Sequence, residues 1–170
     1  MATSPPDPDP RSAPQEERLD TLAALTDAID QVIALATSRL CVFDCDLSDG
    51  GWTSAARAQA LESFLRLRNA RLSLIVHDTR HLETSCPRLV ALLKVYGHAM
   101  QVWRTGVEAR SASDALYIGD DRHYVHRYHV GQPRATLAID MPAQAKPLVA
   151  RFDEIWATGE PALGGSVLGL

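Results

Sequence analysis

Apolar residues recur along most of the chain in two alternating patterns, one typical of amphipathic helices and one typical of buried strands. Four segments carry apolar residues at helical spacing: 17–37, 53–69, 87–97 and 142–156. Short apolar runs bounded by turn residues predict six strands: 39–46, 71–78, 100–104, 115–119, 123–130 and 134–140. Strands separated by helices of this length predict an α/β domain with a largely parallel sheet. The adjacent strands between 115 and 130 add an antiparallel portion, so the expected sheet is mixed.

The two ends of the chain lack these patterns. Residues 1–16 are rich in Pro, Asp and Ser, which predicts a disordered tail. Residues 159–170 carry four glycines among small apolar residues and predict a second, flexible tail. The folded domain is therefore expected over 17–158, and a chain of 170 residues fits a single domain.

Composition and charge mainly exclude classes of protein and partner. The hydrophobic fraction of 46% and the charged fraction of 22% are ordinary for a globular protein. No apolar run reaches the roughly 20 residues that a membrane span requires, and the first residues lack the features of a signal peptide, so we expect a cytoplasmic protein. A net charge of −4 provides no broad field for phosphate backbones, which argues against nucleic acid as a partner.

Aspartates stand at the ends of predicted strands, where open α/β sheets place their ligands. The run Val-Phe-Asp44-Cys-Asp46 followed by Ser48 resembles the first motif of haloacid dehalogenase-type phosphatases, and the run ending in Asp121 resembles their later acidic motif. This resemblance implies a Mg²⁺-dependent phosphatase that uses Asp44 and Asp46. Leu47 and Ser48 replace the usual Gly and Thr, and a strand follows the later motif, so we keep this function as the alternative.

Histidines and arginines gather between positions 122 and 134. His123, His126 and His129 are spaced by three, so only His123 and His129 share a face of a strand, and a metal site would need a third ligand from elsewhere. We therefore expect hydrogen-bonded histidines and no metal. Together with the arginines, this segment is compatible with a small anionic ligand, with a solvated strand face, or with a weak nucleic-acid interface.

The order of elements over residues 19–160 resembles one half of the phospholipase D-like superfamily, whose fold is a three-layer α/β/α domain. More narrowly, the chain is similar to the uncharacterised phospholipase D-like domain at the C-terminus of some bacterial GNAT-type acetyltransferases. The matching pieces are Asp78-Thr79-Arg80, Pro87-Arg88-Leu89-Val90-Ala91-Leu92, Asp114-Ala115-Leu116-Tyr117-Ile118-Gly119-Asp120, Arg127 and Phe152-Asp153-Glu154-Ile155-Trp156.

The catalytic motif of that superfamily is degenerate in this chain. Active members use H-x-K-x4-D, in which the His attacks phosphorus and the Lys neutralises the developing charge. Aligning Asp120 with the motif's Asp puts Ser113 in place of the His and Ala115 in place of the Lys, and no H-x-K occurs anywhere. This loss predicts a domain without the family's phosphodiesterase activity and without a cofactor.

What the resemblance leaves is the cleft. Active members bring two halves together in one chain or as a homodimer, and a degenerate half could keep the groove for binding. The polar residues that we place near it are Asp78, Arg80, Asp114, Asp120 and Arg127. The alternative is structural: Asp78 and Arg80 cap the next helix, and Asp120 shapes a turn. We expect a binding, accessory or regulatory module whose partner is a second copy or an acetyltransferase.

Overall fold

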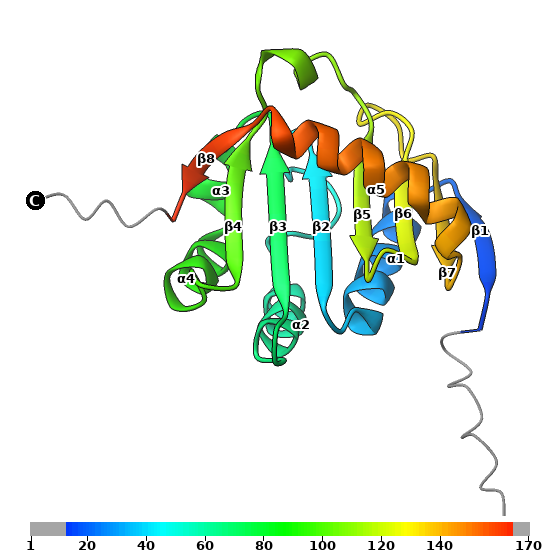
Figure 1. Cartoon of the computed structure of the whole chain (residues 1–170), viewed down its shortest axis with the longest axis horizontal. Coiled ribbons are helices and arrows are strands. Elements are labelled where there is room, and N and C mark those ends of the chain that lie inside the picture. The colour runs from blue at the N-terminus through cyan, green and yellow to red at the C-terminus, as the bar shows by residue number, and fades with distance from the viewer. Residues whose placement is uncertain (1–12, 165–170) are drawn as a thin grey trace, which may run out of the picture.

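The computed structural model describes residues 13–164, which form one eight-stranded sheet in the order β1-β7-β6-β5-β2-β3-β4-β8. The strands are β1 Gln15–Leu19, β2 Arg39–Asp44, β3 Arg71–Val76, β4 Met100–Arg104, β5 Ala115–Gly119, β6 His123–Arg127, β7 Ala135–Ile139 and β8 Glu160–Leu163. The helices are α1 Leu22–Leu35, α2 Ala55–Leu65, α3 Arg80–Ser85, α4 Pro87–Val95 and α5 Pro142–Ala157, with one short 3-10 turn at Val107–Ala109. Figure 1 shows the sheet with α5 lying across it.

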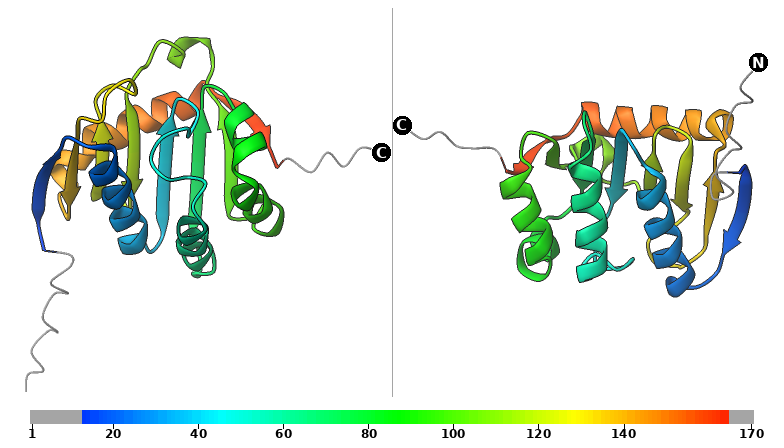
Figure 2. Two further views of the ribbon diagram at one scale, coloured as in Figure 1. Left: turned by 180° about the vertical axis from the view of Figure 1, so that it is seen from behind. Right: turned by 90° about the horizontal axis from the view of Figure 1, so that it is seen from below.

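The sheet is the middle of three layers. Helices α1, α2 and α4 cover one face, and α5 covers the other, as the right-hand view of Figure 2 shows. The apolar stripe of α1 is fully buried on its face of the sheet, and Thr21 caps this helix by accepting a hydrogen bond from the amide of Ala24 at 3.1 Å. On the other face, α5 buries Phe152 and Ile155. The α/β class and the mixed sheet are thus confirmed.

The expectation of a largely parallel sheet is wrong. Only β2–β3 and β3–β4 pair in parallel, whereas the other five pairings of the described strands are antiparallel. The physical reason is the connections: a helix links the parallel strands, but tight turns and short loops link β5, β6 and β7. The edge strands β1 and β8, which the pattern did not predict, add two further antiparallel pairs.

Both edge strands lie in segments that we expected to be tails or helix. Gln15–Leu19 lacks an apolar pattern because four of its five residues are exposed at the edge of the sheet, where main-chain hydrogen bonds to β7 define the strand. Glu160–Leu163 pairs in the same way with β4, although it contains Pro161. The remaining parts of the predicted tails, 1–12 and 165–170, lie outside the described residues.

Within residues 13–164, no helix combines the length and the apolar character needed to cross a membrane.

The hairpin between β5 and β6 turns at Asp120 and Asp121, both of which have positive φ, 51° and 56°. The carboxylate of Asp120 accepts hydrogen bonds from the amides of Thr37, Ser38 and Arg39 at 2.9–3.0 Å, and from the hydroxyls of Thr37 and Ser38. Burial would raise the pKa of Asp120, but these hydrogen bonds outweigh it and hold the pKa below its usual value. Asp120 therefore ties the hairpin to the start of β2.

We expect Asp120→Ala to lower the free energy of unfolding by about 2–4 kcal/mol at pH 7, because five donors lose a charged acceptor. Urea unfolding measures this loss. Folding lowers the pKa of Asp120. Its contribution to the free energy of unfolding is therefore complete above the pKa of the unfolded chain, and it disappears as the pH falls through the lower pKa of the folded chain. The matched control is Asp121→Ala, which breaks only an exposed ion pair with Arg39 and should cost less than about 1 kcal/mol. Equal losses in both variants would contradict the role of Asp120.

Candidate functional site

The degenerate motif lies at the start of β5, beside the end of β2, because the antiparallel register pairs Leu116 with Phe43. Side chains alternate between the two faces of a strand, so successive motif residues point in opposite directions. Ala115 packs with the core residues beneath α1, whereas Leu116 packs with those beneath α5. Asp114 reaches α5 itself through a hydrogen bond from Arg151. The two faces therefore form two different environments.

The α1 side is closed. Ala115 is completely buried, and its cross-strand partner is Arg127 of β6. The Arg127 guanidinium is also buried: it donates to the carbonyl oxygen of Gln132 at 2.7 Å and to the carboxylate of Asp49 at 3.1 Å. The position of the motif's lysine thus holds a methyl group, and the cation next to it is already bonded to protein groups through Nε and Nη2.

Asp44 extends this closed region, which we call the buried polar cluster (Asp44, Asp49, Trp52, Arg57, Tyr117 and Arg127). The Tyr117 hydroxyl donates a hydrogen bond to the Asp44 carboxylate, and Trp52 stacks on the Tyr117 ring with centroids 6.0 Å apart. Burial raises the pKa of Asp44, and the hydrogen bond from Tyr117 opposes this rise. Within the cluster, Tyr117 bonds to Asp44 and Arg127 bonds to the partly exposed Asp49, whereas Trp52 Nε1 and Arg57 Nη1 are buried without a hydrogen-bond partner.

The three aspartates of the phosphatase hypothesis do not come together. Asp44 is 3% exposed at the end of β2, while Asp121 binds Arg39 at the beginning of the same strand. A six-residue strand separates these ends by roughly 16–20 Å. Asp46 folds back locally and accepts a hydrogen bond from the amide of Ser48 at 3.0 Å. This geometry corrects the alternative expectation, because one Mg²⁺ cannot reach both Asp44 and Asp121.

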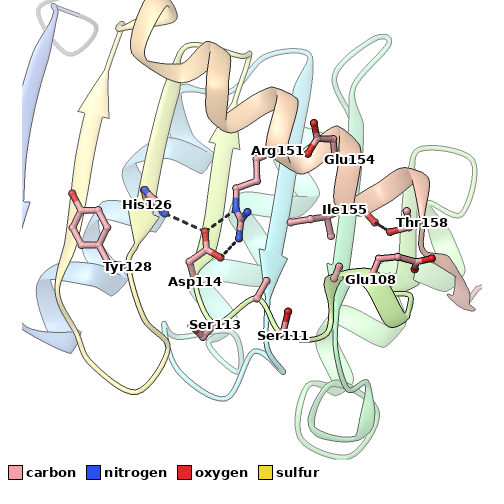
Figure 3. A pocket seen from close by; sticks show the side chains of 12 residues that line it. Glu108, Ser111, Ser113, Asp114, His126, Tyr128, Arg151, Glu154, Ile155 and Thr158 are labelled. Atoms are coloured by element: carbon pink, nitrogen blue, oxygen red, sulfur yellow. Dashed lines mark hydrogen bonds and ion pairs between the residues drawn. The ribbon is translucent and has the colours of Figure 1, made fainter.

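The α5 side of the same strand is open and contains a cavity of about 740 Å³, which we call the Asp114 pocket. Its lining residues come from the loop before β5, from β6 and from α5: Glu108, Ala109, Ser111, Ala112, Ser113, Asp114, His126, Tyr128, Arg151, Glu154, Ile155 and Thr158. Figure 3 shows Asp114, His126 and Arg151 at the centre of this group, with Tyr128 on one side and Glu108 and Glu154 on the other. Its size suits a small molecule.

Asp114 is the hub of the pocket. Arg151 donates to it twice, through Nε at 3.0 Å and Nη2 at 2.6 Å, and His126 Nε2 lies 3.2 Å from the same carboxylate. Burial would raise the pKa of Asp114, but the hydrogen bonds from His126 and Arg151 prevail and hold it well below the usual range. Because an ionised carboxylate can only accept, the proton of the His126 ring sits on Nε2.

The acidic end of the pocket has a different character. Glu108 and Glu154 both line the cavity, and neither forms a salt bridge within residues 13–164. Arg151 is the only Lys or Arg among the lining residues, and Asp114 already pairs with it. The pocket therefore presents negative charge, together with the hydroxyl groups of Ser111 and Ser113.

Of the five cleft residues expected from the sequence, only Asp114 lines this pocket. Arg127 is part of β6 and belongs to the buried polar cluster on the α1 face of the sheet, and Asp120 lies at the opposite end of β5. Asp78 and Arg80 pair with each other at the start of α3, where the hydrogen bond from Arg80 lowers the pKa of Asp78 to about 2. Each of these residues has a structural partner. Asp120 lies in the turn, as the alternative interpretation stated, but the N-cap of α3 is Thr79, and Asp78 only accepts a hydrogen bond from the amide of Arg80 at 2.9 Å.

Two further residues complete the pocket. His126 was one of three histidines considered in the sequence. The hairpin register singles it out, because the three residues 120–122 between the paired ends of β5 and β6 place it opposite Leu116 and diagonal to Asp114. No sequence pattern indicates Arg151, because its hydrogen bonds to Asp114 depend on how α5 packs across the sheet. The degenerate motif positions also separate: Ser113 lines the pocket, whereas Ala115 faces the closed side.

We expect Arg127→Ala to lower the free energy of unfolding by about 3–5 kcal/mol, because removal of a buried cation leaves the polar groups around it uncompensated. Urea unfolding with an unchanged m-value measures this effect. Arg122→Ala is the matched control, since Arg122 precedes the same strand but forms a half-exposed pair with Asp140 and should matter by less than about 1 kcal/mol. A loss no larger than the control's would contradict the assignment of Arg127 to a closed cluster.

Comparisons with known proteins agree with this architecture. The profile of a family described as a domain of unknown function (DUF7931) matches residues 21–163. The sequence matches no curated protein. Among solved structures, the chain is similar to Nuc, a phospholipase D family member from Salmonella typhimurium (TM-score 0.60, 10% identity, 88% of this chain and 99% of that chain). It is likewise similar to NucT from Helicobacter pylori (TM-score 0.63, 12% identity, 88% and 100%).

A third similar structure is TrmBL2, an archaeal chromatin protein with a novel mode of DNA binding (TM-score 0.64, 9% identity, 92% of this chain). This chain spans about half of TrmBL2, 56% of its length. Identities this low reflect the fold alone, and the fold is phospholipase D-like, as the sequence resemblance implied.

Proposed function

Since the chain belongs to a family of unknown function (DUF7931), we propose from its own geometry that it is a non-catalytic phospholipase D-like module that binds a small ligand in the Asp114 pocket. The observation that carries this proposal is the contrast between the two faces of β5. The face that holds the motif's lysine position is filled by Ala115 and Arg127, while the face that holds Asp114 opens into a cavity. Phosphoryl transfer by the superfamily's mechanism needs a free histidine nucleophile and a lysine at the motif positions, where this chain has Ser113 and Ala115, and on the open face Asp114 engages both His126 and Arg151.

The ligand that suits this pocket is a small polar molecule with an amino group. Glu108 and Glu154 are acceptors without a salt-bridge partner among the described residues, whereas Arg151 is engaged by Asp114. An ammonium group placed between the two glutamates would form charge-assisted hydrogen bonds, which are about twice as strong as neutral ones. Ile155 provides the apolar surface on which a short aliphatic chain can pack.

The accessory role rests on the family resemblance rather than on the geometry. In this proposal, the domain acts together with an acetyltransferase supplied in trans or with a second copy of itself. Analytical size-exclusion chromatography with light scattering distinguishes a monomer from a dimer, and a monomer at all concentrations would remove the second copy from the proposal.

We expect Glu154→Gln and Glu108→Gln each to weaken the binding of a matching amine by about tenfold, since each removes one charge-assisted hydrogen bond. The test titrates the purified chain with ethanolamine, putrescine and spermidine and follows the heat of binding by calorimetry.

The control variant for this titration is Glu160→Gln, which removes an exposed carboxylate of β8 that does not line the pocket, and it should leave affinity unchanged. Saturable amine binding that is lost in the two pocket variants alone would support the proposal. Weak binding without saturation, or an equal loss in Glu160→Gln, would contradict it.

A further inference from the structure

A second cavity, of about 650 Å³, adjoins the Asp114 pocket, because Tyr128 lines both. Its other lining residues are Arg18, Asp20, His129, Gln132, Arg134 and Ala135. They converge through a pairing that the sequence pattern did not indicate: β1 lies antiparallel to β7, with Arg18 opposite Thr136. Arg18 thereby comes next to Arg134, which precedes β7, although 116 positions separate the two arginines in the chain.

The side chains of this cavity offer donors. Arg18 and Arg134 both line it, and within residues 13–164 neither forms a salt bridge. The ring of His129 adds a third donor: the amide of Gly131 donates to His129 Nδ1 at 2.9 Å, so the proton of the neutral imidazole sits on Nε2. Asp20 is the one carboxylate in the cavity, and the two arginines outnumber it.

The loop that forms one wall of this cavity is fixed from behind. Arg127 donates to the carbonyl oxygen of Gln132, and the amide of Val130 donates to the carbonyl oxygen of Ser113 at 2.7 Å. The buried polar cluster therefore holds the loop between β6 and β7 in place. A preorganised wall reduces the entropy that a ligand must lose when it binds.

The charge and shape of the site favour a small molecule over a nucleic acid. A phosphate backbone requires an extended basic surface, but Arg127 at the near end of β6 is engaged by Asp49, and Arg122 lies at the other end of that strand, paired with Asp140. The chain as a whole carries a net charge of −4. A cavity of this size is typical of small-molecule sites.

From this arrangement we infer a second binding site, in which Arg18, Arg134 and His129 hold a small oxyanion, a phosphate or a carboxylate. It is separate from the amine site proposed above, since Glu108 and Glu154 lie at the far end of the Asp114 pocket from Tyr128 (Figure 3). The two sites can therefore be tested independently.

The experiment titrates the full chain, labelled with ¹⁵N, with inorganic phosphate and in parallel with citrate at constant ionic strength. We expect saturable shifts of the amides of residues 129–132 and 134 with at least one of these anions. The better ligand distinguishes a phosphate site from a carboxylate site. Arg18→Gln and Arg134→Gln should each weaken binding by about tenfold to a hundredfold, because each removes a charge-assisted donor.

Arg68→Gln is the matched control, because Arg68 is exposed and lines neither cavity, and it should bind as the unchanged chain does. Thermal unfolding verifies that the three variants are folded. Shifts that do not saturate, an equal loss in Arg68→Gln, or unchanged affinity in folded Arg18→Gln and Arg134→Gln would overturn the inference. Tighter binding of a single-stranded oligonucleotide at the same amides, with a steep dependence on salt, would replace it with a nucleic-acid site.

Discussion

The pairing of Ala115 with Arg127 across β5 and β6 determines which face of this domain can accept a ligand. A buried guanidinium is costly unless it is paired and hydrogen-bonded, and Arg127 pairs with Asp49 through Nη2 and donates to the carbonyl oxygen of Gln132 through Nε. These two partners belong to the loops after β2 and β6, so a single side chain fixes both loops to the sheet. The region in which an active relative would place its lysine thereby becomes part of the core.

Because the α1 face of β5 is closed, the polar side chains that a ligand can reach lie on the α5 face. There α5 supplies Arg151 and β6 supplies His126, and both converge on Asp114, which is ionised and saturated by its partners. The resulting surface is electrostatically polar, with carboxylates at one end, an aromatic side chain between the two cavities, and arginines at the far end. Opposite charges at the two ends of one surface give a ligand an orientation as well as affinity.

The sequence predicted the strands and helices that bury a periodic set of apolar side chains, and it missed the two edge strands and the short helix α3. Strands such as β5 are wholly apolar and helices such as α1 are amphipathic, so their buried side chains appear in the sequence as a run or a regular spacing of apolar residues. The strand β1 is held by main-chain hydrogen bonds and therefore shows no pattern of apolar residues in the sequence. For the site, Asp114 is the one residue expected at the cleft that also lines the Asp114 pocket. The face occupied by Arg127 depends on strand register, and the contact with Arg151 depends on helix packing.

The most direct test of the central claim is hydrolysis by the purified chain of one phosphodiester and one phosphomonoester, each with Mg²⁺ and with EDTA. The closed face of β5 predicts no turnover in any of the four reactions above the rate without protein. Metal-independent turnover of the diester would contradict this conclusion, because it would require a free nucleophile, whereas the motif's histidine position holds Ser113 and Asp114 engages His126. Turnover of the monoester that EDTA abolishes would contradict the placement of Asp44 in a closed cluster.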